Sequence, residues 1–414
     1  MKTLFSLVGA LLLSTSAAAN DVAVHVDGHA VHLDVVLPAR PHPTLPTIVF
    51  ESGLGGAGTK DWRRVVPLLP SNQRFVRYDR PGLGGSEPDD RSPTPRYIAS
   101  VLHDALKQAG IAPPYLLVGH SFGGARIRMF AALYPNDVAG LVFVDPTADF
   151  LRGGSDDDLR DIFGPIGLGA KERDEFQEMT RSAETLVPDI PKPVLAELQM
   201  ARALARDGFP DFKTLAPLRN IPVVVLAGES DAEWPTSAPG ISFDFHRWVR
   251  QWQTVRIATL RQFAEGLPEG TFVETPNSSH QVHNSEPELV AWAIDRATYP
   301  NVLHRLERAF ATGGVEELTR EYRAIKAFYP EKEIDDEALN YTGDRLMSVD
   351  KRAGIALFEL NVRDHPRSSR AHEFLAEAYA LDGRKDPAIQ IYERAVALDP
   401  NNQEARRKLA ALRQ

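Results

Sequence analysis

The apolar positions between residues 20 and 300 alternate between two spacings. Val22–Val26 and Val31–Leu37 flank Asp27-Gly28 and alternate apolar with polar residues, which is typical of a β-hairpin. Several later runs are short and almost wholly apolar, as in the buried strands of a parallel sheet. These predicted strands are 47–50, 74–78, 115–118, 139–144, 221–226 and 271–275.

Helical spacing separates these strands. Thr94-Pro95 is a typical helix start, with threonine as N-cap and proline in the first turn. Further helices are expected over 125–134 and from Pro287 to Ala297. Strands that alternate with helices predict an α/β fold with a mostly parallel sheet.

The pattern changes between Thr147 and about Asn220. Charged stretches with helical spacing are broken there by glycine and proline, at 156–163, 170–186 and 193–206. We therefore expect a helical insertion between the strands at 139–144 and 221–226.

After Pro300 the pattern is helical to the end. Residues 369–402 resemble one tetratricopeptide repeat, a helix pair of about 34 residues. Small and large residues stand where that helix pair packs, and His372 replaces the usual first aromatic residue. One period earlier a weaker copy has Arg345 and Val349 in place of an aromatic residue and a glycine. The matching positions are Leu375, Ala376, Tyr379, Gly383, Ala388, Tyr392, Ala395 and Pro400, and, in the weaker copy, Tyr341, Gly354, Phe358 and Pro366.

Composition narrows the classes of function. The chain has 414 residues, 43% hydrophobic and 25% charged, with a formal net charge of -9. This acidic balance argues against nucleic acid as the main partner. The chain has no cysteine, which excludes disulfides, thiolate metal sites and thiol catalysis.

The first residues are typical of a secretory signal. Lys2 precedes an apolar core, Leu4–Leu13, that is too short to span a bilayer. Small residues ending at Ala17-Ala18-Ala19 predict cleavage before Asn20, so we expect a periplasmic or secreted protein. The alternative is an uncleaved anchor, and no other apolar run is long enough to span a membrane. N-terminal sequencing of exported protein would distinguish the two.

A serine motif lies at the centre of this pattern. The apolar run from Tyr115 leads directly into Gly119-His-Ser121-Phe-Gly123, and a predicted helix follows. Glycines on both sides of Ser121 allow a strand and a helix to meet at a sharp turn. Strand, serine turn and helix together form a nucleophile elbow.

From these residues the chain resembles the α/β-hydrolase family. That resemblance implies a Ser–acid–His order along the chain, with Ser121 as nucleophile and His280 as general base. It also implies that the 147–220 insertion is a cap over the site. The Glu51–Gly56 loop would donate one backbone N–H to the oxyanion hole, and Leu54 and Phe122 are the expected donors. Position 121 is serine, so an aspartate nucleophile is excluded.

The acid is left open between two aspartates. Asp231 follows the strand that usually carries it, and Asp145 follows the preceding strand. We favour Asp231; Glu229 and Glu233 remain minor candidates. His283 is a rival to His280, which is preferred because it directly follows a strand and a small-residue turn. His280-x-x-His283 lacks a third ligand at helical spacing, so neither a metal nor a cofactor is expected.

The sequence thus predicts a signal peptide over 1–19, an α/β-hydrolase domain over 20–300, a helical connector over 301–335 and tetratricopeptide-like repeats over 336–414. The expected activity is hydrolysis of a carboxylic ester through an acyl-enzyme on Ser121. Two alternatives remain: a peptidase or amidase of the same fold, and a non-catalytic scaffold that presents the repeats. The repeats would offer a groove for a protein partner or serve as a structural appendage.

Overall fold

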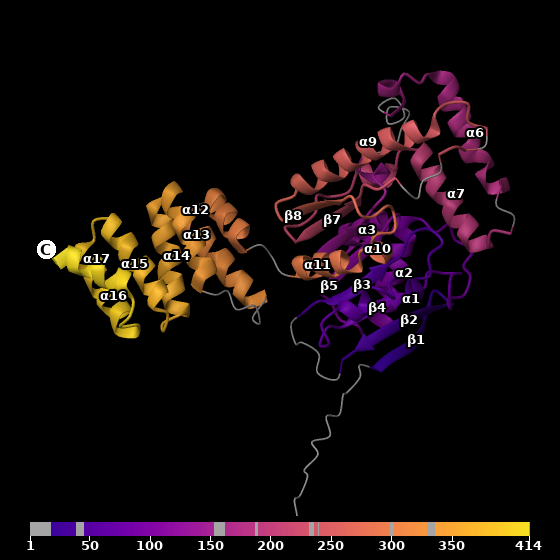
Figure 1. The fold of residues 1–414 in the computed structure, drawn as a ribbon. Helices are drawn as coiled ribbons and strands as arrows, with labels where there is room; N and C mark the ends of the chain where they lie inside the picture. Colours follow the sequence, from indigo (N-terminus) through magenta and orange to yellow (C-terminus); the bar gives the residue numbers. More distant parts are fainter. Residues whose placement is uncertain are drawn as a thin grey trace, which may run out of the picture. The chain divides into compact units, whose positions relative to one another are not determined.

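The structure, a computed structural model, divides into two compact units that meet in sequence after Thr298. The first unit is an α/β domain and the second consists mainly of helices (Figure 1). The residues described are 18–38, 45–152, 162–186, 189–231, 236–238, 240–298, 302–328 and 336–413.

One eight-stranded sheet forms the first unit, in the order β1-β2-β4-β3-β5-β6-β7-β8. The hairpin β1–β2 is antiparallel and joins β4 in antiparallel register, whereas β4, β3, β5, β6 and β7 are mutually parallel. The predicted mostly parallel sheet is therefore confirmed. The strands are β1 (Ala18–Val26), β2 (His29–Leu37), β3 (Thr47–Glu51), β4 (Phe75–Tyr78), β5 (Tyr115–His120), β6 (Val138–Val144), β7 (Val223–Gly228) and β8 (Gly270–Thr275).

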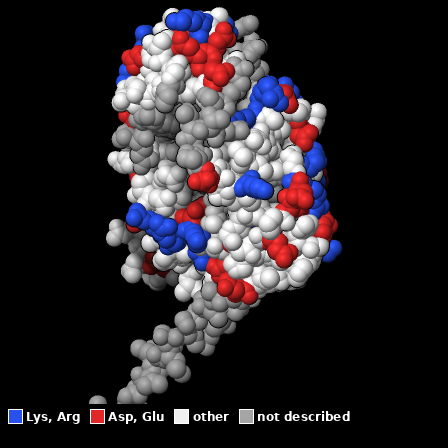
Figure 2. Space-filling view, turned by 90° about the vertical axis from the view of Figure 1, so that its right-hand side faces the viewer, with Lys and Arg blue, Asp and Glu red and all other residues white. Residues whose placement is uncertain are grey.

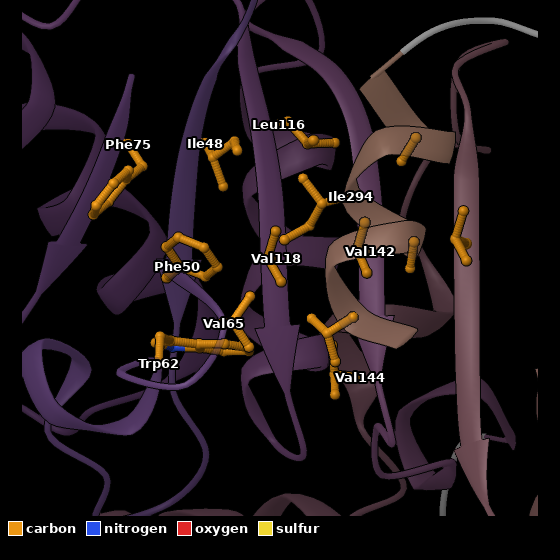
Figure 3. Close-up of a cluster of buried hydrophobic side chains, with 14 of the residues drawn as sticks. Ile48, Phe50, Trp62, Val65, Phe75, Leu116, Val118, Val142, Val144 and Ile294 are labelled. Atoms are coloured by element: carbon orange, nitrogen blue, oxygen red, sulfur yellow. The ribbon is translucent and has the colours of Figure 1, made fainter. Parts of the chain in front are cut away.

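Both faces of the central strands are buried, which explains why their sequences are almost wholly apolar. Successive side chains point to opposite faces. On one face, strand residues such as Val118 and Val142 pack against Ile294 and Trp62 (Figure 3). On the other face, Phe143 packs edge-on against Phe263. Helices on both faces hold the strands in a fixed register, so the loops at their carboxyl ends have a rigid base.

The helices of the core follow the predicted capping signals where these were recognised. The Thr94 side chain accepts a hydrogen bond from the Tyr97 amide at 3.2 Å, as expected of an N-cap. A 21-residue helix, α9, was not predicted. The core helices are α1 (Gly58–Asp61), the 3₁₀ turn η1 (Val66–Leu68), α2 (Pro95–Gln108), α3 (Gly123–Leu133), α9 (Phe245–Glu265), α10 (Val282–Ser285) and α11 (Pro287–Thr298).

Helices also fill the insertion between β6 and β7. An aromatic cluster joins this insertion to the start of α9, where Phe176 lies 4.5 Å from Trp248 between ring centroids. The insertion contains α4 (Asp149–Arg152), η2 (Gly164–Ile166), α6 (Ala170–Leu186), α7 (Lys192–Arg206) and α8 (Pro210–Lys213).

Acidic and basic side chains are interspersed over the face drawn in Figure 2 and do not gather into a field of one sign.

The second unit stacks helices in pairs. The matched repeat is the pair α15–α16, and its predicted packing residues Ala376, Tyr392 and Ala395 are buried. The weaker copy is also a helix pair, α13–α14. The helices are α12 (Val302–Phe328), α13 (Asp336–Val349), α14 (Lys351–Asp364), α15 (Ser369–Leu381), α16 (Lys385–Leu398) and α17 (Gln403–Arg413).

The segment expected as a connector contributes to the core of this unit. Helix α12 is kinked at Gly313-Gly314, and Gly314 has a φ of 66°, which glycine adopts without strain. Leu318 and Tyr322 of α12 share a buried cluster with Leu339 and Leu357 of the next two helices. Helices α12, α13 and α14 therefore share one buried core, although the sequence showed a clear repeat only at α15–α16.

The N-terminal prediction lies largely outside the described residues, which begin at Ala18. Strand β1 starts at that residue and pairs with Leu37, so cleavage before Asn20 would remove two residues of the strand. No helix within the described ranges is long and apolar enough to cross a membrane.

Candidate active site

Ser121 occupies the sharp turn between β5 and α3. Its φ is 53°, a left-handed conformation that costs free energy for a residue with a side chain. A Cβ on Gly119 would lie 2.7 Å from the Gly123 oxygen, and one on Gly123 would lie 2.7 Å from the Glu51 oxygen. Only glycine fits at these two positions, which is the physical reason for the predicted Gly-x-Ser-x-Gly spacing.

His280 lies between the nucleophile and a carboxylate. Its Nε2 is 2.9 Å from Ser121 Oγ, and its Nδ1 is 2.6 Å from Asp145 Oδ2. The loop that holds the ring is fixed on both sides. Glu286 accepts a hydrogen bond of 2.6 Å from Thr275, and the Ser278 carbonyl accepts one from the Ser230 amide.

Asp145 is held in place from several directions. It is 2% exposed and takes a φ of 44° at the end of β6. Its Oδ1 accepts hydrogen bonds from the Gly228 amide at 2.7 Å and from Arg256 Nη1 at 2.8 Å. Because Oδ1 is occupied in this way, Oδ2 is the atom that faces His280. The guanidinium of Arg256 balances the charge of a carboxylate that is shielded from water.

The preference for Asp231 is not supported by the geometry. Asp231 is partly exposed, and its Oδ2 lies 3.1 Å from His246 Nε2, on α9. Asp145 is the aspartate beside His280, because the chain turns sharply after β6 and directs that side chain across the end of β7. Of the two minor candidates, Glu233 lies outside the described residues, and the Glu229 amide bonds the Thr275 oxygen.

The Glu51–Gly56 loop lies directly against the serine. A Cβ on Gly53 would lie 3.1 Å from Ser121 Cβ, so the loop backbone contacts the nucleophile turn. Within the described part of the chain, no hydrogen bond uses the amide of Leu54 or of Phe122. Two backbone donors without an internal acceptor, next to the serine, are the arrangement that an oxyanion hole requires.

Two further histidines surround the site. Burial, with the neighbouring His283 and His280, lowers the pKa of His120 well below its usual range. His120 Nε2 lies 2.9 Å from the backbone oxygen of His280. A carbonyl only accepts, so Nε2 of this neutral ring carries the hydrogen and helps to hold the His280 backbone.

His283 is the predicted rival base, and it does not occupy that position. Its ring packs on His120, at 4.3 Å between centroids, and on Trp62 at 5.1 Å. Burial, followed by the nearby His280, lowers the pKa of His283 to about 4.

The lowered pKa of His283 predicts a loss of stability in acid. The unfolded chain takes up a proton near pH 6.5, but the folded site does so only near pH 4. The stabilising contribution is therefore complete above about pH 6.5 and is lost as the pH falls toward about 4. The loss for this group is on the order of 3 kcal/mol or less. Urea unfolding at about pH 7 and pH 4.5 should show a smaller acid-dependent loss in His283→Leu than in the unsubstituted protein; equal losses would contradict the prediction.

The arrangement has a definite chemical capacity. A ring nitrogen within hydrogen-bonding distance of a serine oxygen can accept its proton, and a buried carboxylate on the other nitrogen favours the protonated ring. Helix α3 begins at Gly123, two residues after Ser121, and its free N–H groups favour developing negative charge there. Among the described residues, no group of three or more His, Asp or Glu side chains is placed to bind a metal ion.

The chain is similar to known proteins over much of its length. Residues 48–294, more than half of the chain, match the alpha/beta hydrolase family, and residues 369–412 match the tetratricopeptide repeat. The chain therefore belongs to the alpha/beta hydrolase family. It is 24% identical over 270 residues to the uncharacterised protein YqjL of Bacillus subtilis, a match that covers 65% of this chain and 88% of YqjL.

Two other relatives support the same class. An AB hydrolase superfamily protein of Gibberella zeae is 25% identical over 306 residues, covering 66% of this chain and 94% of that protein. The putative carbamate hydrolase RutD of Escherichia coli is 35% identical over 111 residues, covering 26% of this chain and 41% of RutD.

Three parts of the site were missed by the sequence analysis. Arg256, on the unpredicted helix α9, holds Asp145. His120 lies inside the motif but was treated as a spacer. Glu197, 2% exposed, lies on α7 of the predicted cap among arginines of the core. Of these three, only His120 has a local signal, because its position in Gly-x-Ser-x-Gly places it beside the serine.

Proposed function

We propose that the protein is a serine hydrolase that cleaves carboxylic esters through an acyl-enzyme on Ser121. The observation that carries the proposal is the position of His280, 2.9 Å from Ser121 and 2.6 Å from Asp145. The contact order Ser–His–Asp is that of a catalytic triad, and family membership supports a hydrolase.

The reaction proceeds in two acyl transfers. Ser121 Oγ attacks the substrate carbonyl carbon while its proton passes to His280 Nε2, and the carbonyl π electrons move to oxygen. The amides of Leu54 and Phe122 stabilise that oxyanion. Its collapse expels the alcohol, which takes the proton from His280, and leaves the acyl group on Ser121. Water then attacks the acyl carbon in the same way, and the carboxylic acid is released.

Esters are the first choice of substrate, and two other acyl compounds compete. Amides would suit a peptidase of the same fold, and the partial likeness to RutD, a putative carbamate hydrolase, adds carbamates. The test is a panel of aryl esters of graded acyl length beside an aryl carbamate and an amino-acyl amide. We expect the highest kcat/KM of the panel on an ester. A higher value on the amide or carbamate would reassign the substrate class, and no turnover of any would favour the scaffold alternative.

Two further proposals concern the ends of the chain. The sequence between Lys2 and Ala19 supports export, with the mature protein starting at Asn20. The helical pairs of the second unit support binding of a protein partner, because stacked helix pairs present a concave surface.

A further inference from the structure

Four charged side chains are buried together beneath the loop that follows β3. They are Glu51, Arg80, Arg126 and Glu197, here called the buried charge cluster; each is 1% or 2% exposed. Arg80 is the centre: its Nη1 donates to Glu51 at 2.8 Å and its Nε to Glu197 at 2.6 Å. Arg126 lies 3.3 Å from Glu51 and 3.1 Å from Glu197. Two positive and two negative charges balance, so the cluster tolerates burial.

The cluster also bonds the backbone on both sides of Leu54. Arg80 Nη2 donates to the Gly53 oxygen at 2.7 Å, and that carbonyl belongs to the same peptide group as the Leu54 N–H. The following peptide group is held as well, since the Gly55 amide donates to Glu197 Oε2 at 2.7 Å. A peptide group is planar, so fixing the Gly53 oxygen fixes the direction of the Leu54 N–H. The positively charged guanidinium that donates to this oxygen also polarises the peptide group and strengthens its N–H as a donor.

Glu197 reaches this loop from the cap. The start of α7 packs on the same loops: a Cβ on Gly55 would lie 2.9 Å from Val194 Cγ1, and one on Gly82 would lie 2.6 Å from Pro193 Cγ. Gly55 has a φ of 68°, so both its conformation and this contact require glycine. Burial acts to raise the pKa of Glu197, but Arg126 and Arg80 outweigh it and lower that pKa to about 2. Glu197 is therefore ionised near neutral pH.

We propose that Glu197 and Arg80 are positioning residues that orient the Leu54 peptide group for the oxyanion, so that cap helix α7 is part of the catalytic apparatus. The inference rests on the proposed function and names residues that it does not use. Both side chains are buried, and both act through the backbone of the loop. Arg80 and Glu197 are 117 positions apart in the sequence, and the hydrogen bond between Gly55 and Glu197 joins residues 142 positions apart.

The test compares an ester with its thionoester. The thiocarbonyl sulfur is a weak hydrogen-bond acceptor, so the thionoester gains little from the oxyanion donors. In Glu197→Gln, kcat for p-nitrophenyl acetate should fall about 10- to 100-fold, less than the loss of a whole donor, with KM within about threefold. The kcat on the matching thionoacetate should fall far less. The ratio of kcat on the ester to kcat on the thionoester should therefore decrease. Arg80→Lys, which keeps the charge but loses the fork of donors, should narrow the ratio in the same way.

A cap variant and a second reaction complete the design. Asp174→Asn removes an exposed charge from α6 of the same cap and should leave the ratio unchanged. Rates are measured well below each variant's melting temperature, because loss of one buried charge also destabilises the fold. An equal loss of kcat on both substrates, or no loss on either, would overturn this inference but not the proposed function. If the unsubstituted protein turned over neither substrate and did not react with a fluorophosphonate, the proposed function would fail and the inference with it.

Discussion

Ser121→Ala should reduce ester turnover by a factor on the order of 10⁶. The substitution removes the only atom that forms the acyl-enzyme and leaves the rest of the site in place. The turn should persist, since alanine and serine are equally strained at a φ of 53° and Gly119 and Gly123 still allow the close approach. The variant should therefore still bind the substrate, although its kcat is lost.

The measurement is kcat on an aryl ester together with covalent labelling by a fluorophosphonate. Labelling should be confined to Ser121 and absent from the alanine variant. Ser100→Ala, the same change on helix α2, is the matched control and should retain full turnover and labelling. Persistent labelling of the Ser121→Ala protein would show that another residue is the nucleophile.

Asp145→Asn should reduce kcat by about 10⁴-fold. The side-chain oxygen of asparagine would remain toward the Gly228 amide and Arg256, because both are donors. The amide nitrogen would then face His280 Nδ1 and donate to it. That ring nitrogen would have to accept, which places the hydrogen on Nε2. A protonated Nε2 in the neutral ring cannot accept the Ser121 proton.

Asp231→Asn is the matched control, since it makes the same change in the loop that follows the neighbouring strand, β7. Asp231 contacts His246 and not His280, so its kcat should stay within about twofold of the unsubstituted protein. The two variants are compared at a temperature where both are folded. A loss in Asp231→Asn as large as that in Asp145→Asn would refute the assignment of the acid.

The two aspartates could not be distinguished from the sequence alone. Both follow apolar strands, and both therefore lie at the carboxyl edge of the sheet, where a catalytic carboxylate is expected. The choice depends on one turn and one distant side chain. Asp145 takes a left-handed conformation and is held by Arg256, which lies 111 residues away on a helix without a clear sequence signal.

The helical insertion between β6 and β7 gives a second example. Its position between β6 and β7 follows from the change of spacing after Thr147, and helices α6 and α7 lie where they were expected. That Glu197 is buried against two arginines does not follow from spacing, because a glutamate on a polar helix is normally exposed.

What the sequence determined by itself is what depends on neighbours along the chain. The period-two and helical spacings specify strands and helices, the glycines around Ser121 specify a sharp turn, and the small-residue loop before His280 specifies its place after a strand. The tertiary structure decided which side chains from distant elements meet: Asp145 with His280, and Arg80 with Glu197. The physical reason is that burial and charge pairing act through space, and one sequence position records only its own residue type, not its partner.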